Sequence, residues 1–144
     1  MSLFSALSVG ASGMSAQRAR AEVLVENLAN AETTRTPEGG PYRRKDLVFE
    51  SSTVDSPFAS VFSSELQSLS GVAVSGVITD MSEPERRYLP GHPDADKDGY
   101  VAFPKINPAE DMVDLMGAAR GYGANVAAIT AVKDMIQRSL DLGR

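Results

Sequence analysis

Both ends of the chain carry long helical patterns, and this pairing restricts the possible folds more than any other feature. Apolar and small residues recur at steps of three and four, close to the heptad period of about 3.5 residues, which keeps them on one helix face. The N-terminal stripe consists of Leu3, Leu7, Gly10, Met14, Gln17, Ala21, Leu24 and Leu28. The C-terminal stripe consists of Met112, Leu115, Ala119, Tyr122, Val126, Ile129, Lys133, Ile136 and Leu140. Helices over residues 3–29 and 108–141 would be about 40 and 50 Å long. We expect the stripes to pack on each other, on neighbouring subunits, or on both, as in an assembly protein.

The ends of both predicted helices carry recognisable signals. Asn107 followed by Pro108 is a strong helix start, because the Asn side chain can accept a backbone N–H and Pro suits the first helical position. We expect the first helix to stop near Asn30, since Asn tolerates the left-handed conformation of a helix C-cap, and Gly143 to close the second helix.

The segment between the helices is β-rich, so the predicted fold class is α+β, with the helices packed as a coiled-coil-like stem. Runs of β-branched and aromatic residues predict short strands near 42–49, 71–78, 86–89 and 100–103. Residues 51–70 are rich in serine and have little periodicity, which indicates a mobile loop. The expected division is an N-terminal assembly helix (1–30), a β-rich middle domain (31–106) and a C-terminal assembly helix (107–144).

The composition argues against several classes of protein. A formal net charge of −5 disfavours a nucleic-acid binder, which usually has a basic face. The chain has no cysteine, so disulfides and thiolate metal sites are excluded. No uninterrupted apolar stretch of about 18 residues exists, so we expect no membrane insertion. The N-terminus lacks the basic start of a secretory signal peptide, so we expect no cleavage.

No motif in the sequence supports an enzyme. Asp94–Gly99 resembles the opening of a calcium-binding EF-hand loop, but Lys105 stands where the loop requires a bidentate Glu. His92 is the only histidine, and no partner or orienting group for general-base catalysis can be identified for it. We therefore expect no catalytic residues, no metal, no cofactor and no small-molecule substrate.

The most specific segments are Ser12–Arg20 and Val25–Thr33. Here the chain resembles the bacterial flagellar rod and hook family, whose N-terminal signature is S-G-[LM]-x-A-Q followed by N-[IL]-A-N-x-x-T. The stretch from Ala124 to Ile136 is similar to the C-terminal signature of this family. Residues 40–49 and 99–107 look most like the proximal rod members. Gly121 and Gly123 depart from the usual helical motif, and they leave open whether the second helix is straight.

The resemblance implies a structural subunit of the flagellar basal-body proximal rod, which polymerises through its terminal helices and transmits torque. It implies export through the flagellar type III apparatus without a cleaved signal, and assembly in the periplasm with other rod proteins and further copies of the chain. The expected assembly interface consists of the residues of both stripes except Gly10 and Lys133, together with Asn27, Asn30 and Asn125. Two other readings remain open at this point, namely a soluble coiled-coil adaptor with a small β-domain and a calcium-responsive sensor or enzyme.

Overall fold

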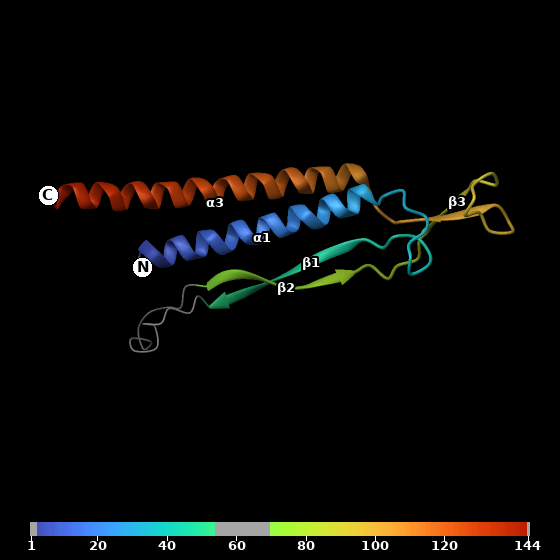
Figure 1. Ribbon diagram of the computed structural model, residues 1–144, viewed down its shortest axis with the longest axis horizontal. Helices are drawn as coiled ribbons and strands as arrows, with labels where there is room; N and C mark the ends of the chain where they lie inside the picture. Colours follow the sequence, from blue (N-terminus) through green and yellow to red (C-terminus); the bar gives the residue numbers. More distant parts are fainter. Residues whose placement is uncertain (1–2, 54–69, 144) are drawn as a thin grey trace. The chain divides into compact units, whose positions relative to one another are not determined.

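A computed structural model describes residues 3–53 and 70–143 of the chain. The elements are the helix α1 (Leu3–Ala29), the strands β1 (Lys45–Thr53), β2 (Ser70–Thr79), β3 (Glu85–Tyr88) and β4 (Tyr100–Phe103), and the helix α3 (Pro108–Leu142) (Figure 1). The predicted α+β class is confirmed. The ends of the expected 51–70 loop belong to β1 and β2, and the rest of it lies outside the described residues.

Contacts group the chain into two compact units. Unit 1 contains Met1–Ala19, Val48–Gly76 and Ala118–Arg144, and unit 2 contains Arg20–Leu47 and Val77–Gly117. Each unit therefore combines a part of α1, a part of the strands and a part of α3. The three-part division expected from the sequence cuts the chain differently and stays a prediction.

The helices begin and end close to the predicted residues. Asn107 Oδ1 accepts the backbone N–H of Ala109 at 3.2 Å, so it is the N-cap of α3. At the end of α1, Asn30 Nδ2 donates to the Glu26 carbonyl at 2.9 Å. The expectation of a left-handed Asn30 is wrong, because no described residue other than glycine has a positive φ. Gly143 follows the end of α3 and likewise has no positive φ. Its N–H donates to the Leu140 carbonyl at 3.2 Å in a simple turn.

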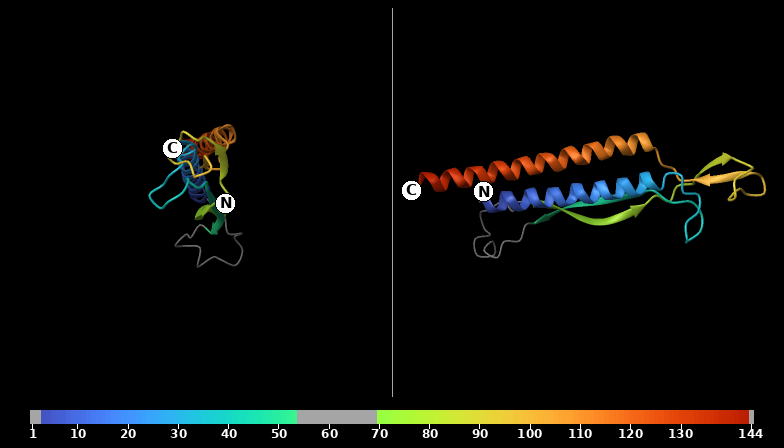
Figure 2. Two further views of the ribbon diagram at one scale, coloured as in Figure 1. Left: turned by 90° about the vertical axis from the view of Figure 1, so that its right-hand side faces the viewer. Right: turned by 45° about the horizontal axis from the view of Figure 1, so that its top comes forward.

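In unit 1, α1 lies beside α3 through small residues (Figures 1 and 2). Ala16 and Ala118 are 3% and 1% exposed. A β-carbon built on Gly13 would lie 2.9 Å from Asn125 Nδ2, and one on Gly121 would lie 3.1 Å from Gln17 Cδ. The glycines therefore leave room for the Asn125 and Gln17 side chains between the two helices, and an alanine at either position would make these side chains shift.

The strands form two separate two-stranded sheets, β1 with β2 and β3 with β4. In unit 1, β2 contacts α1 where the Val72 N–H donates to Ser12 Oγ at 3.1 Å. In unit 2, β3 and β4 are antiparallel, with Glu85 opposite Phe103 and Tyr88 opposite Tyr100. The buried apolar residues of unit 2 include Leu24, Tyr42, Val101 and Phe103.

Candidate assembly interface

The helix α1 exposes only a narrow line of residues. The exposed positions recur at steps of four and three, whereas every other position from Ser5 onward is buried or half-buried. This spacing describes one helix edge, so the chain itself covers most of the α1 surface. The exposed positions are Ala11, Ser15, Arg18, Glu22, Val25 and Ala29.

The helix α3 has the opposite character, because it is covered on one side only. Its buried and half-buried positions are Asp111, Asp114, Leu115, Ala118, Gly121, Asn125, Ile129, Val132 and Ile136. All its other positions up to Gly143 are exposed. Several of these are large and apolar, including Met112 at 54%, Val113 at 67% and Met116 at 57% exposure. An exposed apolar helix face of this kind often marks a protein–protein contact.

The predicted interface residues divide between these surfaces. On α3, Leu115, Asn125, Ile129 and Ile136 belong to the covered side, whereas Met112, Ala119, Tyr122, Val126 and Leu140 are exposed. On and just after α1, Leu24 and Asn27 are buried, and Leu7, Met14, Gln17, Ala21, Leu28 and Asn30 are half-buried. Leu3 begins α1, and its side chain lies outside the described part. The assembly role of the whole set stays a prediction.

The sequence pattern missed several residues that matter to these surfaces. Ala16 and Ala118 are among the most buried side chains, and Val113 and Met116 are among the most exposed on α3. The stripes already contained small residues such as Gly10, Ala21 and Ala119, but they left out Ala16 and Ala118, and the α1–α3 contact in unit 1 depends on small residues. A search for glycine and alanine at steps of three and four could have identified that contact.

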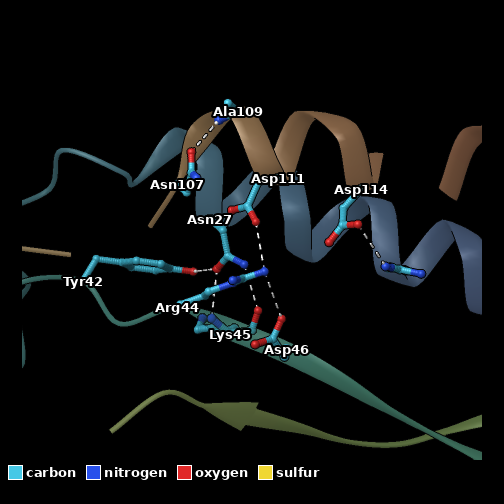
Figure 3. Close-up of polar contacts among 10 residues, drawn as sticks. Asn27, Tyr42, Arg44, Lys45, Asp46, Asn107, Ala109, Asp111 and Asp114 are labelled. Carbon is cyan, nitrogen blue, oxygen red and sulfur yellow. Dashed lines mark hydrogen bonds and ion pairs between the residues drawn. The ribbon is translucent and has the colours of Figure 1, made fainter. Parts of the chain in front are cut away.

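The signature residue Asn27 is fully buried in unit 2 and bonds to the backbone of β1 (Figure 3). Its Nδ2 donates to the Lys45 carbonyl at 2.8 Å, and its Oδ1 accepts the Lys45 N–H at 2.9 Å. Tyr42 Oη donates to the same Oδ1 at 3.0 Å. The side-chain amide therefore pairs with the N–H and the carbonyl of Lys45 as the backbone of a neighbouring strand would. In this conformation Asn27 has no exposed surface that could contact another subunit.

Burial has a clear effect on Tyr42. Its ring is 9% exposed, and removal from water, followed by the nearby Glu26 carboxylate, raises the pKa of its phenol to about 12. A phenolate is poorly tolerated there, because both causes disfavour the charged form.

The buried carboxylate of Asp111, in the first turn of α3, forms an ion pair with Arg44, which directly precedes β1. Asp111 is 1% exposed, and its Oδ1 lies 3.0 Å from Arg44 Nη2 (Figure 3). Arg44 also faces Asp46 at 3.6 Å. Among the described residues neither oxygen of Asp111 has a well-oriented hydrogen bond. Burial raises the pKa of Asp111, and the Arg44 charge opposes this only in part.

The acidic turn 94–99 uses its carboxylates inside unit 2. Asp94 Oδ2 accepts the Thr34 hydroxyl at 2.8 Å, and Asp96 Oδ1 accepts the N–H groups of Asp98 and Tyr100 at 3.0 and 2.8 Å. Gly99 has a φ of +82°, a conformation that suits glycine. Within residues 3–53 and 70–143, no group of three or more His, Cys, Asp and Glu side chains could hold a metal ion.

In the part of the chain that the structure describes, neither helix is long and apolar enough to cross a membrane. Most of α1 and the whole of α3 lie in regions that match known protein families. Residues 7–35 match the family described as "Flagella basal body rod protein". Residues 97–142 match the family described as "Flagellar basal body rod FlgEFG protein C-terminal". The chain thus has the features of the flagellar rod class at both ends.

Full-length relatives are more specific. The chain is 38% identical to the flagellar basal-body rod protein FlgC of Borreliella burgdorferi, over 97% of each chain. It is 39% identical to FlgC of Bacillus subtilis and 35% identical to FlgC of Salmonella typhimurium, in each case over the whole of both chains. The chain therefore belongs to the FlgC family of flagellar basal-body rod proteins, and the resemblance inferred from its sequence is confirmed.

Proposed function

We propose that the protein is a structural subunit of the bacterial flagellar basal-body proximal rod, which polymerises through its terminal helices to transmit torque. The single observation that carries this proposal is the full-length similarity to proteins named as basal-body rod proteins. The role is structural and not catalytic, in agreement with the absence of a catalytic motif from the sequence. The location is the flagellar basal body.

The exposed side of α3 supports polymerisation through the helices. Met112, Met116 and Val126 are each at least 41% exposed, and covering them on a neighbouring subunit would remove apolar surface from water at about 25 cal/mol per Å². The buried members of the predicted interface act indirectly, since Leu24 and Asn27 hold α1 in place. Repeated contacts between different surfaces that do not close into a ring generate a helical tube.

The proposed partners are other rod proteins, further copies of this chain and the flagellar type III export apparatus. Assembly takes place in the periplasm, after export without a cleaved signal peptide. A chain without cysteine forms no disulfide in an oxidising compartment, which suits passage and late folding. Nucleic acid, membrane insertion and small-molecule substrates have no part in this function.

The test is complementation of a strain that lacks its own proximal rod protein. Expression of this chain is expected to restore motility, and imaging of purified basal bodies is expected to show rods that contain it. Expression without rods or motility would contradict the proposal. A discrete soluble dimer that never enters basal bodies would instead support the coiled-coil adaptor.

A further inference from the structure

The first turns of α3, which belong to unit 2, direct their carboxylates inward. Asp111 is 1% exposed, and its Oδ1 lies 3.0 Å from Arg44 Nη2. Asp114 is half-buried, and its Oδ1 lies 3.5 Å from Nη2 of Arg20 on α1. Figure 3 draws both carboxylates with these partners. A surface helix normally has the opposite arrangement, with its charged side chains toward water.

The outer side of the same turns is apolar and contains two thioethers. Met112, Val113 and Met116 are 54%, 67% and 57% exposed. Residues three and four apart are neighbours on a helix surface, so the three side chains form one patch. We call Met112, Val113 and Met116 the methionine patch. Its side chains make few contacts within the chain and are accessible to small molecules in a free subunit.

Methionine sulfur is the most easily oxidised group of this chain, because the chain has six methionines and no cysteine. Met14 on α1 is half-buried. Met81, which follows β2, and Met135 on α3 are 77% and 53% exposed. Oxidation converts a methionine from a flexible apolar side chain into a polar one, so its effect depends on whether the side chain must later be buried.

We propose that Met112 and Met116 are a reversible oxidation site that controls whether a free subunit can enter the rod. The oxidant is hydrogen peroxide. A lone pair of the thioether sulfur attacks one peroxide oxygen, the O–O bond breaks and an S–O bond forms. The leaving hydroxide takes the remaining proton and departs as water. Sulfur thereby loses two electrons and peroxide gains them, which leaves methionine sulfoxide.

The sulfoxide acts on assembly and not on the fold. Its oxygen is a hydrogen-bond acceptor that water satisfies in the free subunit, and an apolar neighbour that covers the patch cannot replace this water. An oxidised subunit is therefore excluded from the rod, whereas the patch of an assembled subunit is covered and protected. Reductases that use a dithiol remove the oxygen as water and restore the thioether. This inference rests on the proposed rod function and adds a regulation to it.

Oxidation of the purified chain tests whether the patch is accessible. The chain is treated with hydrogen peroxide, and mass spectrometry of its peptides measures the sulfoxide at each methionine. Met112 and Met116 should oxidise at least threefold faster than Met14 in the folded chain and at the same rate in urea. The two methionine sulfoxide reductases, one for each sulfoxide epimer, should then restore both residues. Equal rates in the folded chain, or sulfoxide that resists both reductases, would contradict the site.

Two double variants separate the chemistry of the patch from its shape. Met112→Leu with Met116→Leu stays apolar and cannot be oxidised, whereas Met112→Gln with Met116→Gln carries polar side chains of similar length to the sulfoxide. We expect the leucine variant to be recovered in basal bodies at half of the wild-type amount or more, and the glutamine variant to be reduced at least tenfold. Met81→Gln is the exposed control and should match the wild type. Equal thermal unfolding midpoints verify the fold, and wild-type recovery of the glutamine variant would refute the proposal.

A short exposure to peroxide during synthesis of the chain tests the regulation in cells. The wild type made in this period should be recovered in basal bodies at least fivefold less than without peroxide. The leucine double variant should lose less than twofold, although its Met81 and Met135 are still oxidised. An equal loss for both proteins would assign the effect to other peroxide damage and overturn the inference.

The outcomes distinguish this inference from the proposed function. If the chain is present in basal bodies and both proteins respond equally to peroxide, the oxidation site falls and the rod function stands. If the chain is missing from basal bodies even without peroxide, both conclusions fall.

Discussion

Ile129 of α3 lies directly over Gly10 of α1, so that a β-carbon at residue 10 would stand 2.9 Å from Ile129 Cγ1. Both residues belong to the predicted stripes, so the stripes pack on each other at this point, and a further contact of the half-buried Ile129 with a neighbouring subunit stays a prediction. A glycine opposite a branched side chain lets two helix backbones approach closely. The same contact supplies the first prediction.

Gly10→Ala should destabilise the chain by about 1–2 kcal/mol, because the added methyl overpacks Ile129 by more than the improved helix propensity recovers. Gly123→Ala is the matched control, since a β-carbon there meets nothing within 4 Å. It should stabilise α3 by roughly 1 kcal/mol. Urea unfolding of both variants measures the difference, and equal shifts in the same direction would contradict the close α1–α3 packing.

Asn27→Ala should cost about 2–4 kcal/mol, because it leaves the Lys45 N–H, the Lys45 carbonyl and the Tyr42 hydroxyl without their buried partner. Tyr42→Phe removes one hydrogen bond to Asn27 Oδ1 and should cost about 1 kcal/mol. Denaturant midpoints compare the two variants. A loss no larger for Asn27→Ala than for Tyr42→Phe would show that the amide does not hold β1.

Stability should fall at high pH through Tyr42. Its pKa is about 12 in the folded chain and about 10 in an unfolded one, so between these values the unfolded state releases the proton first. The wild type should lose up to about 2–3 kcal/mol across this window, relative to Tyr42→Phe. Parallel pH-dependent unfolding curves for the two proteins would refute this.

Asp111→Asn should be neutral or stabilising at pH 7, because the raised pKa of Asp111 means that the folded chain favours the uncharged side chain over the carboxylate, and Arg44 keeps Asp46 as a partner at 3.6 Å. For the same reason the wild type should lose stability as the pH rises from the ordinary carboxyl pKa of 3.8 through the raised value, and the variant should lack this slope. Unfolding of both proteins between pH 4 and 7, where other carboxylates titrate equally, isolates the effect. A clear loss of stability in Asp111→Asn at pH 7 would instead make the ion pair a net contributor.

Val126→Asp should leave the chain folded and exported but unable to build a rod. Val126 is 41% exposed and lies on the predicted stripe, so a carboxylate there is tolerated in the monomer and costs several kcal/mol once a neighbour covers it. It is a cleaner probe than Ile129→Asp, which would also disturb the packing on Gly10. Arg138→Asp is the control, on the exposed side near the end of α3, and cells that carry it are expected to swim. If cells that express Val126→Asp at the wild-type level swim normally, Val126 is not part of the interface.

The sequence predicted those elements whose signals are local. Asn107 and Pro108 define the start of α3 through groups within one helical turn, and alternation along residues 100–103 predicts β4 from four neighbours. The side of α3 that packs on α1 could not be predicted in the same way. Large residues such as Met112 and Val126 dominate a hydrophobic pattern, whereas the side that packs on α1 depends on Gly121 and Ala118, which contribute little hydrophobicity. The burial of Asn27 depends on the backbone of Lys45, and no pattern of side chains reveals a backbone partner.

The cover of α1 in unit 1 comes from the far end of the chain. Gly10 meets Ile129, and Gln17 meets Gly121, so α1 remains uncovered on that side until α3 is in place. The broad outer side of α3 forms only in the same event. A chain that is truncated before α3 would therefore lack both the cover of α1 in unit 1 and the helix surface through which, under the proposed function, subunits join.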